Sequence, residues 1–480
     1  MYRNYIAGEW VEGEATNRNI NPSDTRDIIG EYALASATQA DAAIRAAADA
    51  APACATATAE QRSDALDRIG TTILSRQQEL GELLSREEGK PLAEGIGEVV
   101  RAGRVFKYFA GESLRMGGER LPPVRPGVEV DVTRHPVGAV GVITPWNFPI
   151  AIPAWKIAPA LAYGNSVVFK PAGLAPGCAW ALAEIIAETA GLPAGAFNLV
   201  MGSGSVVGDR LARSPQIDAL TFTGSTAVGR GLAVLCAERG AKVQLEMGGK
   251  NPLIVLDDAD LEQAVQIAVN GGLYSTGQRC TASSRIIVEA GIHDRFVTRI
   301  RDVVSQLRVG HALEASTDIG PAISEEQLNQ DLHYIHQARD EGAKLECGGE
   351  ALRRETPGYY LSPAIFSETT SDMTLNREEV FGPVLGIIRA NDYDQALEFA
   401  NGTEYGLSSG ICTRSLAHAA DFRRRSKAGM IMVNLPTAGV DYHAPFGGTG
   451  ASSYGPREQG AHARQFFTTT RTSYMAPGDV

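Results

Sequence analysis

The sequence predicts an α/β protein with two doubly wound, mostly parallel sheets and a separate β arm. Short apolar runs alternate with helical segments from about residue 137 to residue 433, and this alternation is typical of parallel sheets covered by helices. A segment with four prolines, 119–136, precedes the alternation. The length of 480 residues is enough for about three domains.

The residues before the proline-rich segment predict a layer of helices. Ala-rich residues 38–53 indicate one helix, and apolar residues at helical spacing indicate a second from Glu60 to about Glu88. The turn Gly89-Lys90-Pro91 ends that helix, and another is expected from about 92 to 113.

Residues 119–136 predict an exposed strand. The run from Val128 to Val132 alternates apolar and polar residues, and the flanking prolines are typical of an edge or arm.

Two sets of strands and helices follow. In the first, strands are expected at Val137–Ile143, Ser166–Phe169, Phe197–Val200, Ala219–Phe222 and Val243–Leu245, with helices at 176–190, 204–212 and 226–238. In the second, strands are expected near 252–256, 285–289, 343–347, 384–388, 408–412 and 430–433, with helices near 260–275, 292–306, 324–340, 392–401 and 415–425. Each set predicts one α/β domain.

Composition excludes several classes of protein. A net charge of −12 argues against nucleic-acid binding, because phosphates would be repelled. The start lacks the apolar core of a signal peptide, and no run of eighteen apolar residues predicts a membrane span, so we expect a cytoplasmic protein. The six cysteines have no Cys-x-x-Cys spacing, and the eight histidines do not pair at metal-site spacing. Free thiols and no metal are expected.

One cysteine and one glutamate predict the chemistry. Cys280 lies in Gly277-Gln278-Arg279-Cys280, where Gly277 allows close backbone approach and Arg279 is expected to favour the thiolate. Glu246 ends a predicted strand beside Gly248-Gly249. A thiol can add to a carbonyl carbon, and a carboxylate can activate the water that releases the acyl group. With a hydride acceptor between them, these steps oxidise an aldehyde.

Three further segments supply candidate binding groups. The turn Thr144–Pro149 holds Asn147, whose amide can donate to an oxyanion. Gly224-Ser225 follows a strand and opens a helix, where backbone N–H groups suit a pyrophosphate. Lys170 ends a predicted strand, at the edge where α/β sheets bind ligands. A structural turn or a solvated side chain is the alternative for each.

These segments, in this order, resemble the NAD(P)-dependent aldehyde dehydrogenase superfamily over almost the whole chain. The motifs are Pro145-Trp146-Asn147-Phe148-Pro149, Lys170-Pro171, Phe222-Thr223-Gly224-Ser225, Leu245-Glu246-Met247-Gly248-Gly249-Lys250, Gly277-Gln278-Arg279-Cys280, Glu379-Val380-Phe381-Gly382-Pro383 and Pro445-Phe446-Gly447-Gly448. Thr449-Gly450-Ala451 departs from the usual pattern, which has a Lys or Arg two residues after the last motif.

The resemblance implies a role for each candidate. Cys280 would be the nucleophile, Glu246 the base for deacylation, and Asn147 with the Cys280 N–H the oxyanion hole. The implied cofactor residues are Lys170 and Glu379 for ribose hydroxyls, Ser225 for pyrophosphate with Gly224 shaping the turn, Phe381 near the nicotinamide ribose, and Trp146 and Thr144 beside them. It also implies an NAD(P)-binding domain (1–118 and 137–248), a catalytic domain (249–447) and an arm that forms a homodimer or homotetramer (119–136 and 448–480).

The resemblance also bears on specificity. Many NAD-preferring relatives carry a glutamate where this chain has Gly173, so we expect NADP to be accepted alongside NAD. Trp155 and Tyr274 replace the two arginines of succinate-semialdehyde dehydrogenases. The segment from Asp441 to Gly460 is similar to bacterial 2-oxoglutarate semialdehyde (2,5-dioxopentanoate) dehydrogenases, with Arg279 or His443 as the candidate for the distal carboxylate.

Other functions remain open on the sequence. The small-molecule substrate could be succinate or glutarate semialdehyde or a plain aliphatic aldehyde. A CoA-acylating enzyme is disfavoured because that branch generally lacks the glutamate base, and a catalytically silent binding protein is disfavoured because Cys280, Glu246 and Asn147 are all present.

Overall fold

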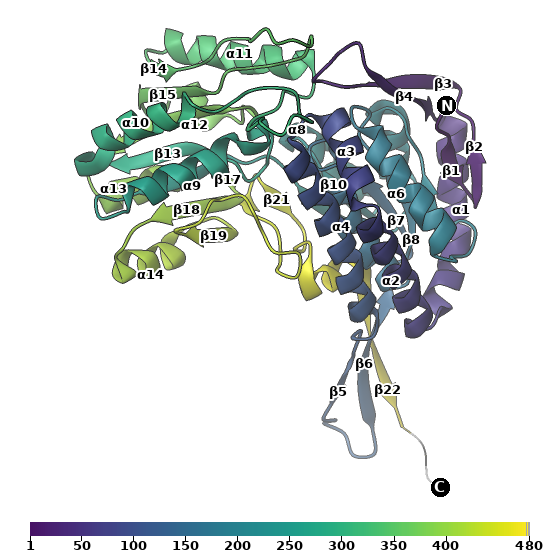
Figure 1. Cartoon of the computed structure of the whole chain (residues 1–480). Helices are drawn as coiled ribbons and strands as arrows, with labels where there is room; N and C mark the ends of the chain where they lie inside the picture. The colour runs from purple at the N-terminus through teal and green to yellow at the C-terminus, as the bar shows by residue number, and fades with distance from the viewer. Residues whose placement is uncertain (477, 479–480) are drawn as a thin grey trace.

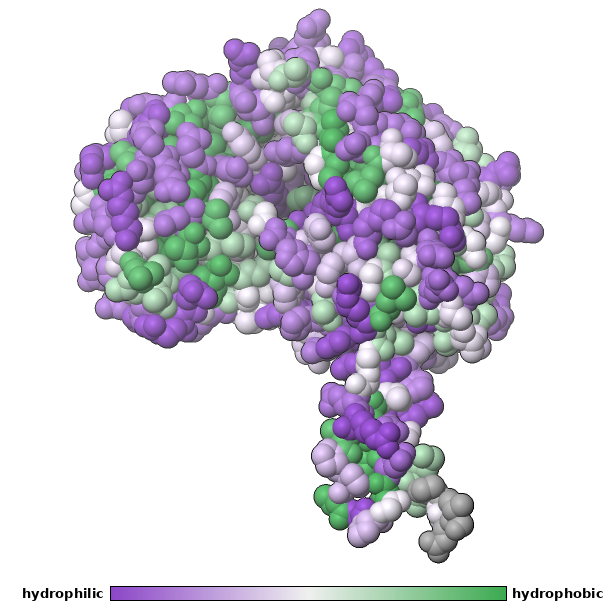
Figure 2. All heavy atoms as spheres, turned by 60° about the horizontal axis from the view of Figure 1, so that its bottom comes forward, coloured by the Kyte–Doolittle hydropathy of each residue, from purple (hydrophilic) through white to green (hydrophobic). Residues whose placement is uncertain are grey.

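The computed structural model describes residues 1–476 and 478 and shows two lobes and an arm (Figure 1). The N-terminal half builds the right-hand lobe of the figure, and most of the C-terminal half builds the left-hand lobe. The arm projects from below the first lobe. On the face shown in Figure 2 the surface is hollowed between the two lobes.

An eight-stranded sheet forms the centre of the first lobe, in the order β2-β1-β9-β8-β7-β10-β11-β21. Its parallel strands are β7 (Ala139–Ile143), β8 (Ser166–Lys170), β9 (Phe197–Leu199), β10 (Ala219–Thr223) and β11 (Lys242–Glu246). Antiparallel edges are added by β1 (Asn4–Ile6), β2 (Glu9–Val11) and β21 (Ser453–Tyr454). The order reverses between β7 and β10, which is where such sheets bind ligands.

Helices cover both faces of this sheet and largely match the expected ones. They are α1 (Ala37–Thr56), α2 (Ala59–Ser75), α3 (Gln77–Glu88), α4 (Leu92–Ser113), α5 (Ala151–Ala162), α6 (Pro176–Thr189), the π-helical turn η1 (Gly204–Gly208), α7 (Asp209–Arg213) and α8 (Thr226–Glu238).

The single helix expected from Glu60 to Glu88 is wrong, because the chain breaks at Arg76. Its backbone leaves helical geometry (φ −101°, ψ 17°), and its guanidinium binds Glu79 at 2.7 Å and Glu184 at 3.2 Å. Ile73 and Leu80 on either side enter the same core, so the apolar spacing continues across the break.

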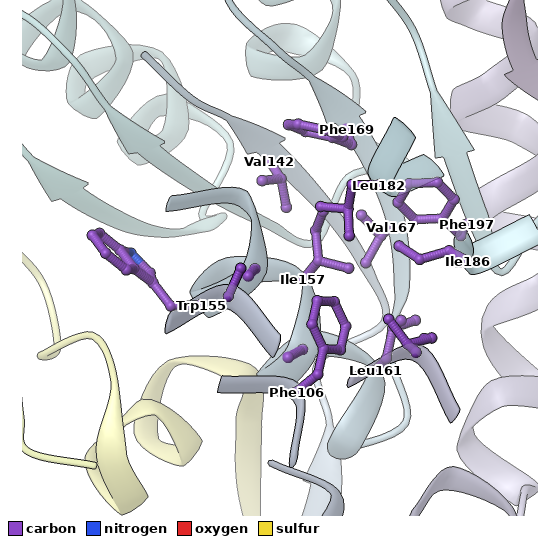
Figure 3. Packing of buried hydrophobic residues seen from close by; sticks show 14 of the residues in the cluster. Phe106, Val142, Trp155, Ile157, Leu161, Val167, Phe169, Leu182, Ile186 and Phe197 are labelled. Carbon is purple, nitrogen blue, oxygen red and sulfur yellow. The ribbon is translucent and has the colours of Figure 1, made fainter. Parts of the chain in front are cut away.

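The core of this lobe lies between α4, α5, α6 and the sheet (Figure 3). Phe106, Ile157, Leu161 and Ile186 point toward one another there. Trp155 of α5 lies apart from these side chains, at the edge of the cluster (Figure 3). Burial of this apolar area is the main force that holds the lobe together.

A seven-stranded sheet forms the second lobe, in the order β14-β15-β16-β13-β12-β18-β19. The strands are β12 (Asn251–Val255), β13 (Ser283–Glu289), β14 (Lys344–Cys347), β15 (Ala364–Thr369), β16 (Val384–Ala390), β18 (Ser408–Cys412) and β19 (Met430–Val433). All pairs except β14–β15 are parallel. The helices are α9 (Leu261–Leu273), α10 (Ala290–Val304), α11 (Glu325–Asp340), α12 (Thr374–Arg377), α13 (Tyr393–Ala400) and α14 (Leu416–Arg425).

The arm is a three-stranded antiparallel sheet of β5 (Glu119–Leu121), β6 (Glu129–Pro136) and β22 (Thr468–Met475). Its exposed large hydrophobic side chains include Leu121, Val124 and Tyr474. Green, hydrophobic residues are visible on the projecting part of Figure 2.

The segment 448–480 is not confined to the arm. Strand β20 (Thr449–Gly450) pairs with β17 (Tyr405–Gly406), β21 joins the first sheet, and α15 (Arg464–Phe467) packs into the first lobe. Residues 477, 479 and 480 of this segment lie outside the described residues. The hairpin of β3 (Ala15–Ile20) and β4 (Ile28–Leu34) was not expected from the sequence. Among the described residues, no helix combines the length and apolar character needed to span a bilayer.

Candidate active site

The candidate residues of the first lobe gather at one edge of its sheet. Asn147 follows β7, Lys170 ends β8, Ser225 follows β10 and Glu246 ends β11. These strands are parallel, so their carboxyl ends lie together at the edge where the strand order reverses.

Two cavities meet at Cys280. The first, here named the α4 cavity, has a volume of about 270 Å³ and is lined by Lys90, Glu94, Gly97, Glu98, Arg101, Phe148, Ile152, Trp155, Ser275, Arg279, Cys280, Thr281, Ala438, Gly439, Val440 and Phe446. The second, the α8 cavity, has about 300 Å³ and is lined by Pro145, Trp146, Asn147, Ile152, Thr223, Gly224, Ser225, Met247, Gly248, Cys280, Gln327, Gln330, Glu379 and Phe381. Cys280 therefore lies at the boundary that the two cavities share.

The backbone around Cys280 is tightly constrained. Gly277 has φ +66°, and a Cβ there would overlap the Gly382 carbonyl, so only glycine fits. Ser275 and Thr276 also have positive φ (52° and 56°), a strained conformation that often marks functional sites. The Cys280 carbonyl accepts a hydrogen bond of 2.8 Å from the Asn251 amide.

The electrostatic setting of Cys280 differs from the sequence expectation. Burial, and then the carboxylates of Glu379 and Glu246, raise the pKa of the Cys280 thiol. The expectation that Arg279 favours the thiolate is wrong, because its guanidinium is directed to Glu94 at 3.4 Å and to the Ser275 hydroxyl at 2.8 Å.

Glu246 is buried with 3% of its surface exposed. Ser453 donates a hydrogen bond of 2.5 Å to its Oε2. Burial raises the pKa of Glu246 well above its usual range, the Glu458 carboxylate adds to this, and the Ser453 bond opposes it. Glu246 itself is not among the residues that line the α8 cavity, but the adjacent Met247 and Gly248 are. When ionised, such a carboxylate is a strong proton acceptor.

A buried polar group behind Glu246 was missed by sequence reasoning. Lys156 of α5 pairs with Glu458, and its Nζ also donates to the Thr221 hydroxyl at 2.8 Å. Trp155 Nε1 donates to the other Glu458 oxygen at 2.6 Å. A lysine within an apolar helix was the available signal, since buried lysines are rare without a partner.

Asn147 is held beside Cys280 by two hydrogen bonds. Its side-chain Nδ2 donates to the Gln278 main-chain carbonyl at 2.9 Å, and the Asn147 main-chain carbonyl accepts a hydrogen bond from Lys90 Nζ at 2.8 Å. Lys90 in turn pairs with Glu98 at 2.8 Å. An amide NH₂ has two donor hydrogens, and the Gln278 bond uses one of them.

The α8 cavity contains donors suited to a phosphorylated ligand. Ser225 is the N-cap residue of α8, yet its hydroxyl makes no capping bond. The hydroxyl of Thr223, which lines this cavity, is buried with no hydrogen-bond partner among the described residues, and so is that of Thr144, which is not among the lining residues. A helix N-terminus with free hydroxyls favours an anion such as pyrophosphate.

Glu379 and Phe381 also line the α8 cavity. Glu379 accepts a hydrogen bond of 2.8 Å from the Gly249 N–H, and burial raises the pKa of this carboxyl to about 7. Phe381 has φ +65° and meets Trp146 edge-on, with 5.4 Å between ring centroids.

Lys170 lines a third cavity, here named the β8 cavity, of about 460 Å³. Burial lowers the pKa of Lys170 to about 8, and its Nζ donates to the Pro171 carbonyl at 3.0 Å. The cavity is also lined by Gly173 and Arg18, and none of its lining residues is acidic. The neutral and basic lining suits a ligand with additional negative charge.

The family model of the aldehyde dehydrogenase family matches residues 10–473. The chain belongs to this family. The resemblance and the α/β fold expected from the motifs are thereby confirmed, and the protein is an oxidoreductase of the aldehyde dehydrogenase class.

Similar proteins of this family cover nearly the whole chain. An alpha-ketoglutaric semialdehyde dehydrogenase of Bacillus subtilis is 43% identical, covering 99% of this chain and 98% of the relative. An alpha-ketoglutarate semialdehyde dehydrogenase of Haloferax volcanii is 40% identical, with 98% of each chain covered. A 2,5-dioxopentanoate dehydrogenase of Saccharolobus solfataricus is 38% identical, again with 98% of each covered.

Solved structures of the family have the same fold. Betaine aldehyde dehydrogenase of Staphylococcus aureus in complex with NAD+ has a TM-score of 0.97 at 33% identity, covering 100% of this chain and 96% of that chain. NAD-dependent aldehyde dehydrogenase of Sinorhizobium meliloti has a TM-score of 0.96 at 34% identity, covering 100% of this chain and 95% of that chain.

Within this aldehyde dehydrogenase the two candidate residues for the substrate carboxylate are placed differently. Arg279 lines the α4 cavity beside Cys280. His443 is exposed and lines neither the α4 nor the α8 cavity. The described residues contain no group of three or more His, Cys, Asp and Glu side chains arranged to hold a metal ion.

Proposed function

We propose that this protein oxidises 2-oxoglutarate semialdehyde to 2-oxoglutarate with NADP+ or NAD+, using Cys280 as nucleophile and Glu246 as general base. The observation that carries the reaction is the position of Cys280 where the α4 and α8 cavities meet. An aldehyde in the α4 cavity and a nicotinamide in the α8 cavity would lie on opposite sides of the sulfur.

In the first half-reaction Cys280 reacts as the thiolate: the thiol proton is released to solvent, and the sulfur adds to the aldehyde carbon. The carbonyl oxygen becomes an anion, which the Asn147 amide and the Cys280 N–H stabilise. Removing one such donor typically costs about 3 kcal/mol of transition-state stabilisation. A nicotinamide held in the α8 cavity would supply the hydride acceptor, and loss of the hydride from the thiohemiacetal carbon leaves a thioester on Cys280.

In the second half-reaction Glu246 takes a proton from water, and the hydroxyl adds to the thioester carbon. The carbon–sulfur bond breaks, the acid leaves, and Cys280 is restored. Burial raises the pKa of Glu246, so its ionised form accepts a proton from water more readily than an exposed carboxylate does, and this step requires that ionised form.

The residues present fit the cofactor. Ser225, Thr223 and the α8 N-terminus would hold the pyrophosphate, Glu379 one ribose, and Lys170 the other. Gly173 and the absence of acidic side chains from the β8 cavity lining support NADP as well as NAD.

The cofactor proposal is tested by kcat/KM for both cofactors in the wild type and in Gly173→Glu. A Cβ at Gly173 would meet only the Asn17 side chain, at 3.7 Å, so the new carboxylate can be accommodated. It should repel a 2′-phosphate and lower kcat/KM for NADP more than for NAD. A hundredfold preference of the wild type for NAD would contradict the proposal.

The substrate proposal is supported by the names of the three relatives at 38–43% identity and by the segment from Asp441 to Gly460. The test is NAD(P)H release with 2-oxoglutarate semialdehyde, succinate semialdehyde, glutarate semialdehyde and aliphatic aldehydes. The first should have the highest kcat/KM. A plain aliphatic aldehyde with an equal or higher value would refute it.

We also propose that the arm joins copies of the chain into a homodimer or homotetramer in the cytoplasm. The exposed apolar residues Leu121, Val124 and Tyr474 support burial of the arm in an interface. Light scattering after size-exclusion chromatography tests this, and a monomer at micromolar concentration would contradict it.

A further inference from the structure

The α4 cavity is lined by three cationic side chains, and two of them already have carboxylate partners. Lys90 pairs with Glu98 at 2.8 Å. Arg279 pairs with Glu94 at 3.4 Å and also binds the Ser275 hydroxyl. Their charges are largely compensated within the protein, so neither is free to attract an anionic substrate strongly.

Arg101 is the third cation, and it has no carboxylate partner among the described residues. One terminal nitrogen donates to the Val440 carbonyl, and the other donates to the Gln459 side chain at 3.0 Å. Its Nε is buried without a hydrogen-bond partner in the described part of the chain. Both of its hydrogen-bond partners are neutral, so no carboxylate in the described part of the chain pairs directly with its positive charge.

The surroundings of Arg101 make this charge costly. Its guanidinium carbon lies 5.6 Å from the centre of the Trp155 ring, and Phe148, Phe446 and Val440 line the same cavity. Burial lowers the pKa of Arg101, and the carboxylates of Glu98 and Asp441 only partly oppose this. A partly buried guanidinium in apolar surroundings gains most from an anion that enters the cavity.

The cavity also leads from Arg101 to the nucleophile. Arg101 on α4, Trp155 on α5 and Cys280 all line it. In Figure 3 Trp155 lies at the edge of the buried apolar cluster. A five-carbon chain with one terminal aldehyde is about 5 Å long from the aldehyde carbon to the carboxylate carbon. A cavity of about 270 Å³ has room for such a molecule.

We propose that Arg101 binds the distal carboxylate of an acidic aldehyde and sets the preference of the enzyme for acidic over neutral aldehydes. This inference rests on the proposed function, and it assigns the carboxylate to a residue on α4 instead of Arg279 or His443. Arg279 then holds the strained turn before Cys280 through Glu94 and Ser275.

The test compares an acidic and a neutral aldehyde of equal chain length, glutarate semialdehyde and pentanal, in the wild type, Arg101→Met and Arg101→Lys. The readout is the ratio of their kcat/KM values, which cancels general losses of activity. A hydrogen-bonded ion pair lost from the complex should lower this ratio roughly 10- to 150-fold in Arg101→Met. Arg101→Lys should retain part of the preference, because it keeps the charge but loses the forked donor geometry.

Arg104→Met is the matched control, because Arg104 lies on the same helix with an exposed side chain. It should leave the ratio within about twofold of the wild type. Arg279→Gln should lower activity with both aldehydes to a similar degree. A ratio unchanged in Arg101→Met, or lowered only in Arg279→Gln, would overturn the assignment of Arg101.

Failure of the inference is distinguishable from failure of the proposed function. If the wild-type enzyme shows no preference for the acidic aldehyde, the proposal that its substrate is an acidic aldehyde is contradicted. If the wild type prefers the acidic aldehyde and Arg101→Met retains this preference, only the proposed role of Arg101 is contradicted. If thermal melting shows that Arg101→Met does not fold, Arg101→Lys is tested instead. The measurement is then inhibition of the enzyme by the product 2-oxoglutarate, compared with the wild type. Unchanged inhibition in Arg101→Lys would contradict the proposal.

Discussion

Replacing Glu246 by Gln should separate the two half-reactions of the proposed mechanism. The amide is isosteric with the carboxyl and can still accept the hydrogen bond from Ser453, which is 2.5 Å long in the wild type. It cannot take a proton from water. Hydride transfer comes before hydrolysis, so each active site should release one NAD(P)H rapidly and then stall as the thioester.

The expected loss in steady-state turnover follows from the proposed role of Glu246. General bases contribute about 10²- to 10⁴-fold, and efficiency increases with basicity. We therefore expect Glu246→Gln to lower steady-state turnover within this range, which corresponds to about 3 to 5 kcal/mol of activation free energy.

Rapid-quench or stopped-flow measurement of NAD(P)H at micromolar enzyme concentration gives both the burst and the steady-state rate. Glu238→Gln, an exposed change at the end of α8, is the control and should leave both unchanged. Undiminished steady-state turnover in Glu246→Gln would refute the assignment of the base. A burst slowed by the same factor would show that Glu246 acts in the first half-reaction instead.

Two further predictions concern the cofactor site. A Cβ on Gly248 would overlap the Glu379 carboxylate, so Gly248→Ala should raise the KM for NAD(P) roughly 10- to 150-fold, as for loss of a charged hydrogen bond. Gly231→Ala, with no neighbouring atom within 4 Å, should leave this KM unchanged, and equal KM values in the two variants would contradict the prediction. Cofactor affinity in a fluorescence titration should be greatest between about pH 7 and 8, because Glu379 is ionised above its pKa of about 7 and Lys170 is charged below its pKa of about 8. Glu379→Gln should remove the weakening at acidic pH, and a flat wild-type profile would exclude titration of both groups.

The parallel strands and most helices could be predicted because their local patterns reflect their burial. Strands such as β8 and β12 are buried along their whole length, so the sequence shows each of them as a short apolar run. Burial also explains why helix α5 was not predicted from the sequence. All residues of α5 are buried, so the helix has no polar face and gives no amphipathic pattern. The strands β1 and β2 were missed because three residues carry too little pattern.

The sequence motifs identified candidate reactive residues that lie together in the structure, but their electrostatic environment could not be predicted. Lys156 and Glu458 are separated by 302 positions, and only the folded chain brings them together behind Glu246. Tertiary contacts of this kind decide which charges are already compensated. Sequence motifs can therefore identify candidate reactive residues, but they do not show which charge in the folded protein is available to a substrate.

The two arginines of the α4 cavity illustrate this difference. Arg279 is adjacent to Cys280, yet Glu94, 185 positions away on α4, accepts from its guanidinium. Arg101 has no motif around it and lies 179 positions before Cys280 (280 − 101), but α4 places it in the same cavity. Since a free cation attracts an anionic substrate more strongly than one that is already paired, the arginine without a partner is the better candidate for specificity. The residue to mutate first is therefore chosen by asking which cationic side chains of the cavity lack a carboxylate partner. Distance along the chain from the nucleophile does not identify it.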